Sequence, residues 1–226
     1  MGTYKRLPTR EKRLQGEGEV GTWLEMVYRW LEINWRAVAA GIATLLIVIA
    51  AVFLVAKLVG AKDEKARVAY YEATKFAPGS EEAINAYNKV IESFSGSGAA
   101  NAARLKLGDI YYDKGEYDKI VEVLTPAVKA KELLIKTIAM NNIAAAKFAK
   151  GDFEGAASEY LKAYSNEKNP TRGISYFNAG LAYVQAGKID EAKSVFAELS
   201  NEETKFTTPE LKEKSLRQMI WIAAKK

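Results

Sequence analysis

Any catalytic chemistry in this sequence would depend on carboxylates, lysines or tyrosines, because the chain contains no histidine and no cysteine. Thiolate and imidazole zinc sites, disulfide frameworks and Ser-His-Asp or Cys-His catalysis are therefore excluded. The carboxylate pairs that do occur, Asp109 with Asp113 and Glu202 with Glu203, have the spacing of solvated helix faces. We predict a protein that is not an enzyme and that holds no cofactor and no metal ion.

The sequence does not indicate nucleotide or nucleic-acid binding. The segment Gly96-Ser97-Gly98 has neither the lysine nor the preceding strand of a phosphate-binding loop. Of the 33 basic and 28 acidic residues, eight basic and five acidic residues lie in residues 1–60, so residues 61–226 are close to neutral. Proteins that bind nucleic acids usually concentrate lysine and arginine on one face. We therefore predict no nucleic-acid partner.

One apolar segment, residues 37–56, runs for twenty residues without a charge. As a helix it would be roughly 30 Å long, which is the thickness of the hydrocarbon core of a bilayer. Arg36 and Lys57 flank it, and four aromatic residues precede it as an interfacial belt would: Trp23, Tyr28, Trp30 and Trp35. A buried core helix seldom runs so long without a polar face, and the apolar stretch of a signal peptide is shorter and lies nearer the start. We predict a single transmembrane helix.

The flanks of this segment predict its orientation and its limits. Basic residues are frequent on the short N-terminal side, which favours an N-terminus on the cytoplasmic side of the membrane and a C-terminal domain on the outer side. Thr22 and Glu25 form a capping-box pattern that predicts a helix start. The predicted organisation is a flexible tail over residues 1–21, an interfacial and transmembrane helix over 22–60, and a helical domain over 61–226.

The chain repeats itself after the apolar segment. Gly115, Gly151 and Gly187 follow one another at intervals of 36 residues, and each stands between two similar amphipathic stretches. A weaker fourth copy precedes them. Repetition at such a period is typical of solenoids, in which each unit buries its apolar face against its neighbours. We predict helices near 62–77, 80–94, 99–114, 117–130, 132–150, 153–165, 171–187, 189–200 and 209–224, the last as a cap over the final unit.

The spacing of small and aromatic residues resembles the tetratricopeptide repeat. Gly108, Ala144 and Gly180 occupy the position where the two helices of a unit touch. Two further sets share one helical face, a small position with Ala83, Ala156 and Ala192, and an aromatic position one turn later with Tyr87, Tyr160 and Phe196. A small residue permits close approach, and the aromatic ring fills the next layer. The second unit departs from the pattern, with Ile120 and Leu124 at these two positions. The resemblance implies an all-α fold, a transmembrane helix followed by a tetratricopeptide-like α-solenoid of antiparallel helix pairs.

The resemblance also implies a concave face lined by the first helix of each unit. That face would form a peptide-binding groove made of Leu105, Asp109, Tyr112, Asn141, Ala145, Phe148, Ile174, Phe177, Leu181 and Val184. The groove is mostly apolar and aromatic and lacks the lysine and asparagine pattern that clamps a C-terminal carboxylate. Unfolded or amphipathic peptide segments would suit it better than acidic tails. The alternative is that some of these residues belong to the core and are covered by residues 62–77 or 209–224.

A basic tail, one span and a tetratricopeptide-like domain together resemble the bacterial YfgM-type family of ancillary subunits of the SecYEG translocon. The resemblance implies a single-pass inner-membrane protein with a periplasmic domain that cooperates with a membrane-anchored chaperone. Its partners would be translocated polypeptides, translocon subunits and chaperones. Two alternatives stay open: a tethered scaffold that docks one folded partner in an envelope or secretion complex, and a reversed topology with a cytosolic domain that receives targeted proteins.

Overall fold

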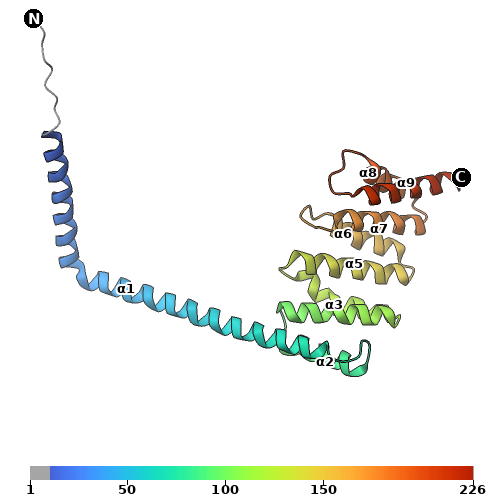
Figure 1. The fold of residues 1–226 in the computed structure, drawn as a ribbon, viewed down its shortest axis with the longest axis horizontal. Coiled ribbons are helices and arrows are strands. Elements are labelled where there is room, and N and C mark those ends of the chain that lie inside the picture. The colour runs from blue at the N-terminus through green and yellow to red at the C-terminus, as the bar shows by residue number, and fades with distance from the viewer. Residues whose placement is uncertain (1–10, 226) are drawn as a thin grey trace, which may run out of the picture. The chain divides into compact units, whose positions relative to one another are not determined.

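The computed structural model describes the backbone of residues 11–225 and the side chains of residues 23–225. These residues form α-helices and one 3-10 helix, without a strand. The contacts between residues divide the chain between Val59 and Gly60 into two units. Helix α1 (Glu11–Ala73) contains this boundary, and the remaining helices all belong to the second unit (Figure 1).

Helix α1 begins at Glu11 instead of at Thr22, where the capping box predicts a start. Residues 11–21, predicted as tail, are therefore helical, while residues 1–10 lie outside the described residues. Glu11, Lys12, Arg13, Leu14 and Gln15 are all strong helix formers. A capping box marks the N-terminus of a helix only where the backbone before it is not helical. Here the residues before Thr22 are helical and continue α1.

The apolar part of α1 is exposed along its length. Leu46, Ile47 and Phe53 are 59%, 69% and 71% exposed, and the most apolar stretch of the helix is unburied. Among the described residues, this is the one helix whose length and composition suffice to cross a membrane. A core helix of a soluble domain would bury such a surface, because each exposed apolar side chain costs about 1.5–3 kcal/mol relative to a buried one.

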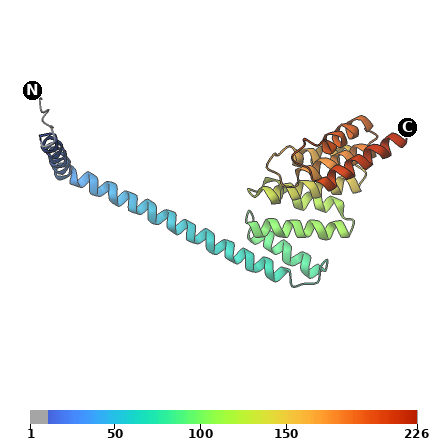
Figure 2. The ribbon, with the colours of Figure 1, turned by 45° about the horizontal axis from the view of Figure 1, so that its top comes forward.

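The second unit is a solenoid of helix pairs, which confirms the predicted all-α fold (Figure 1). Its helices are α2 (Glu81–Ser93), α3 (Gly98–Asp113), α4 (Tyr117–Leu124), the 3-10 helix η1 (Thr125–Lys129), α5 (Leu133–Ala149), α6 (Phe153–Tyr164), α7 (Arg172–Gln185), α8 (Ile189–Ser200) and α9 (Pro209–Ala224). Each helix packs against the next along the chain from α2 to α9. Both views show the helices in one ordered stack from green to red (Figure 2).

The turns between paired helices explain the recurring glycines. Gly115, Gly151 and Gly187 have φ angles of 71°, 84° and 75°, in the left-handed region that side chains disfavour. After each glycine the backbone N–H of the next residue reaches back to a carbonyl near the helix end, as Asp152 N does to Lys147 O at 2.9 Å. This is the Schellman closure of a helix C-terminus. The 36-residue interval thus marks the end of the first helix in each unit.

The sequence predicts one helix over 117–130 in the second repeat, but the structure has two shorter helices there. Helix α4 stops at Leu124 after eight residues, and η1 follows it. Pro126 lies at the start of η1 and has no N–H to continue the α-helical hydrogen bonds. The shortened helix coincides with the residues Ile120 and Leu124 that break the repeat pattern.

Close helix contacts occur where the sequence places its small residues. A Cβ atom added to Gly180 on α7 would lie 2.8 Å from the ring of Phe196 on α8 and 2.9 Å from Val195. At Gly108 on α3 the added atom would lie 3.1 Å from a methyl group of Leu124. Contacts below 3.0 Å force a neighbour to move. The α7–α8 pair therefore depends on a residue without a side chain.

Replacing Gly180 by alanine should destabilise the domain by about 1–3 kcal/mol, because the methyl group overpacks the α7–α8 contact. Thermal unfolding of the full chain in a mild detergent, followed by circular dichroism, measures the loss. Gly98→Ala is the matched control, since an added Cβ there meets nothing within 4 Å and alanine favours the helix. Equal melting temperatures for the two variants would contradict this account of the contact.

Candidate binding surface

Helices α3, α5 and α7, the first helices of the last three repeat units, carry all the residues predicted for the groove. The structure distributes these residues over several environments. Asp109, Tyr112 and Ala145 line one cavity, and Ile174 lines another. The remaining predicted residues are half-buried, and their surroundings differ from unit to unit.

The first cavity has a volume of about 350 Å³ and lies among α3, α4 and α5. Gly108, Ile120 and Ala145 give it apolar walls, and Asp109, Tyr112, Asp113 and Asn142 give it polar groups. Tyr112 is 47% exposed, and its ring meets that of Tyr117 edge-on at 5.6 Å between centroids. The cavity therefore combines an apolar floor with carboxylates.

Leu105, Asn141 and Phe148 contribute to packing between helices. Leu105 packs against the cluster that contains Ile120 and Leu124. Asn141 Nδ2 donates to Thr171 Oγ1 at 3.5 Å, and its Oδ1 is buried without a hydrogen-bond partner among residues 23–225. The ring of Phe148 lies 5.1 Å from that of Phe153 on α6.

Helix α7 holds four predicted residues, of which one faces solvent. Ile174 is 54% exposed and lines a cavity of about 180 Å³ beside Phe206 and α9. Phe177, Leu181 and Val184 pack against the cluster that includes Leu211 and Ile222 of α9. The capping helix thus covers part of this face, which is the arrangement that the core alternative describes.

An aromatic cluster fixes the loop before α9 to the last units. The rings of Tyr164 and Tyr176 stack with centroids 4.0 Å apart, and both hydroxyls donate to the carboxylate of Glu198. The guanidinium of Arg172 lies 4.6 Å from the ring of Tyr164 and 4.4 Å from that of Phe206. Burial, together with the hydrogen bond and charge of Glu198, raises the pKa of the Tyr176 hydroxyl. These contacts stabilise the wall of the smaller cavity.

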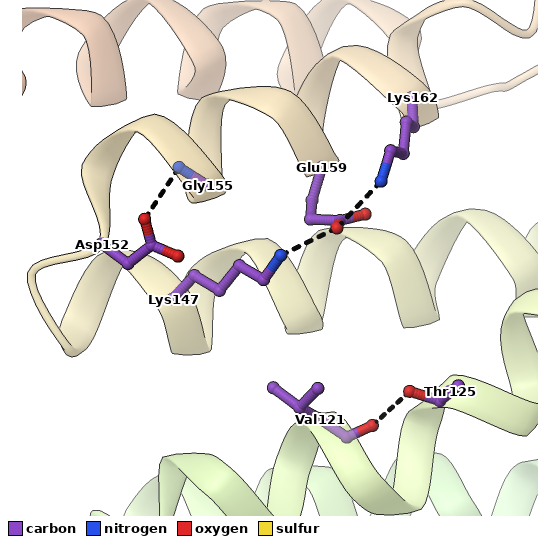
Figure 3. A network of polar contacts seen from close by, with 7 residues as sticks. All are labelled: Val121, Thr125, Lys147, Asp152, Gly155, Glu159 and Lys162. Atoms are coloured by element: carbon purple, nitrogen blue, oxygen red, sulfur yellow. Dashed lines mark hydrogen bonds and ion pairs between the residues drawn. The ribbon is translucent and has the colours of Figure 1, made fainter.

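A charged network joins α5 to α6 behind the concave face (Figure 3). Glu159 Oε1 accepts from Lys147 Nζ at 2.8 Å and from Lys162 Nζ at 3.0 Å. The Glu159 side chain is only 17% exposed. Burial raises its pKa, but the hydrogen bonds and charges of the two lysines outweigh burial and hold the pKa below the ordinary value of 4.5. Lys147 lies 36 residues from both Tyr111 and Tyr183, so it takes the place of a tyrosine found in two other units, and the structure pairs it with Glu159.

Glu159→Gln should lower stability at neutral pH by about 1 kcal/mol, because the part-buried hydrogen bond from Lys147 and the exposed one from Lys162 lose their charge assistance. Because the pKa of Glu159 is lowered in the folded state, its carboxylate stabilises the fold at pH values above the unfolded pKa of 4.5. This contribution is lost as the pH falls through the folded pKa. The difference between wild type and variant should therefore shrink on acidification. Urea unfolding across this range measures it, with Glu154→Gln as control, since the pair that Glu154 forms with Lys188 is more exposed. A difference independent of pH would contradict the role of the network.

Two residues of the cavity among α3, α4 and α5 are not among those predicted for the groove. In the sequence Asp113 has the spacing of a solvated helix face and Asn142 has no distinguishing signal, yet both line the cavity with Asp109. The spacing of Asp109 and Asp113, four residues on one helix, was the available signal, because it places both carboxylates on one face. Across the described residues, no group of three or more acidic side chains is placed to hold a metal ion.

Fold and surface together define a class of protein, the α-solenoid whose helix pairs present an interaction surface for other proteins. The chain belongs to the tetratricopeptide repeat-like domain family, whose model matches residues 28–215. Repeat folds of this class typically act as scaffolds and not as enzymes.

A solved structure has a similar fold. The chain is similar to the crystal structure of nearly identical TPR-like repeats from Podosopora anserina, named after the kinesin light chain, with 16% identity and a TM-score of 0.51. The match covers 74% of this chain and 87% of that chain. The crystal structure of a point variant of these repeats aligns with 16% identity and a TM-score of 0.45, over 73% of this chain and 94% of that one. No curated protein sequence matches the chain.

Proposed function

We propose that this protein is a membrane-anchored, polypeptide-binding module of the bacterial inner membrane, with its solenoid in the periplasm as an ancillary factor of the SecYEG translocon. The observation that carries the proposal is the exposed apolar stretch of α1 joined directly to a repeat domain. In water such a stretch would be left uncovered, whereas a bilayer covers it. A binding surface tethered in this way meets chains as they leave the membrane.

The solenoid supports the proposal through apolar side chains that its own helices leave uncovered. Tyr112 on α3, Leu134 on α5 and Ile174 on α7 are each about half exposed, at 47%, 52% and 54%. All three lie on the first helix of a unit, the set that lines the concave face in tetratricopeptide-like proteins. Apolar side chains on this set suit peptide segments of loose sequence preference.

Photocrosslinking in cells tests the function. Crosslinking residues at Tyr112 and Ile174 sample the solenoid, those at Trp23 and Trp30 sample exposed positions of α1, and Asp190 on α8 serves as the control. We expect many envelope proteins from the solenoid sites, translocon subunits from the tryptophan sites, and neither from Asp190. One folded partner from all the sites would replace the proposal with a tethered scaffold.

Cysteine labelling tests the topology, because the chain has no native cysteine to interfere. A cysteine introduced at Asp190, whose side chain is 98% exposed, should react with a membrane-impermeant maleimide in spheroplasts. A cysteine at Thr3 should react only after permeabilisation. The reverse pattern would place the solenoid in the cytosol and contradict the periplasmic assignment.

A further inference from the structure

The cavity among α3, α4 and α5 lies where the repeat pattern fails. In three units an aromatic ring, of Tyr87, Tyr160 or Phe196, occupies the second helix and is buried. The unit of α4 has Leu124 at this position and Ile120 one turn earlier. Ile120 lines the cavity of about 350 Å³, and Leu124 packs against Gly108, which also lines it. A site-specific departure from an otherwise regular repeat is typical of a functional position.

The walls of this cavity differ in character from its rim. Ile120 is 1% exposed, and with Gly108 and Ala145 it forms an apolar floor. Asp109 and Asp113 lie one helical turn apart on α3, and the half-exposed ring of Tyr112 belongs to the same rim. An occupant must therefore combine an apolar part with a group that suits two carboxylates and an aromatic ring.

The two carboxylates are available to such an occupant. The partner of Asp109 is Lys106, one turn away on the same helix at 3.7 Å, and both side chains are more than half exposed. Exposed pairs of this kind hold their partners weakly, so an incoming cation can replace the lysine. Asp113 forms no ion pair with any of residues 23–225.

We propose that this cavity binds the side chain of an arginine within a bound polypeptide. The methylene stem would pack on Ile120 and Ala145, as long cationic side chains do on apolar surface. The planar guanidinium would donate hydrogen bonds to the carboxylates of Asp109 and Asp113, and its face would stack on the ring of Tyr112. Arginine fits better than lysine, because its flat, weakly hydrated cation both forks onto carboxylates and stacks on rings.

This inference rests on the proposed function and makes it more specific: polypeptides would be selected by a basic residue beside an apolar segment. A divalent cation suits the cavity less well, since two carboxylates supply fewer oxygen ligands than calcium or magnesium takes. Within residues 23–225, no group of three or more acidic side chains is placed to hold a metal ion.

Fluorescence anisotropy with the purified full chain in a mild detergent tests the proposal. The probe is a short fluorescein-labelled peptide of alanine, leucine and serine that carries one arginine, and its matched control carries glutamine instead. We expect the arginine peptide to bind on the order of tenfold more tightly. Asp109→Asn with Asp113→Asn should remove this preference and leave the affinity for the glutamine peptide unchanged.

Two further variants make the result specific. Asp190→Asn removes an exposed carboxylate on α8 and should preserve the preference for arginine. Asp113→Lys should reverse the preference, so that a glutamate peptide binds more tightly than the arginine peptide. Equal affinities of wild type for the arginine and glutamine peptides would overturn the arginine site while leaving the polypeptide-binding function intact. No binding of any peptide would overturn both.

Discussion

Replacing Phe196 by alanine is expected to lower the stability of the solenoid by about 3–5 kcal/mol, the cost of removing a fully buried aromatic side chain. Phe196 is 0% exposed and packs against Gly180 and against the ring of Phe177, whose centroid is 5.5 Å away. Neighbouring helices cannot easily close the cavity, because Phe196 belongs to a buried cluster that also holds Leu211 and Ile222 of α9.

The damage should be local, because each unit of a solenoid contacts mainly its neighbours. Hydrogen exchange of the full chain should therefore show faster exchange in α7, α8 and α9, and little change in α2 and α3. Phe76→Ala is the control: this ring is 45% exposed, and its removal should cost about 1 kcal/mol at most. Uniform acceleration along the chain would show that the units unfold together and contradict this local account.

Replacing both Leu46 and Ile49 by arginine should prevent the apolar stretch of α1 from inserting into the membrane. Both residues are more than half exposed in the middle of the stretch. Arginine at the centre of a transmembrane helix costs about 2.5–3.5 kcal/mol by insertion measurements, so the pair costs about 5–7 kcal/mol. Fractionation of cells after alkaline extraction should find the wild type in the membrane pellet and the double variant in the supernatant.

The matched control for this variant replaces both residues by alanine, which shortens the side chains but keeps the stretch free of charge. That protein should stay in the membrane pellet. If the arginine variant also resists extraction, another part of the chain or a partner protein holds it in the membrane. The apolar stretch would then not be the anchor.

The regular part of the fold could be predicted from the sequence, because its signals are local. The glycines at Gly115, Gly151 and Gly187 require a left-handed backbone, and each ends a helix where predicted. Caps such as Ser80, Ser97 and Thr208 accept backbone N–H groups at the helix starts. Each of these features depends on residues within a few positions of one another.

Predictions failed where a local signal competed with its context. Thr22 and Glu25 form a capping box in sequence, yet the helix formers before them extend α1 back to Glu11. The helix predicted over 117–130 divides at Leu124, because Pro126 removes a donor that the pattern of apolar residues does not reveal. Apolar periodicity reports which face is buried but not where hydrogen bonding stops.

By itself the sequence determined the all-α class, the period of the repeat and the presence of a helix long and apolar enough to span a membrane. Only the tertiary structure decided which residues of the concave face are open. It placed Asp109 and Asp113 beside Ile120 of another helix, brought Glu159 to Lys147, and covered part of the last unit with α9. The physical reason is distance along the chain: propensity and periodicity act between near neighbours, whereas cavities and buried ion pairs arise from side chains that only packing brings together.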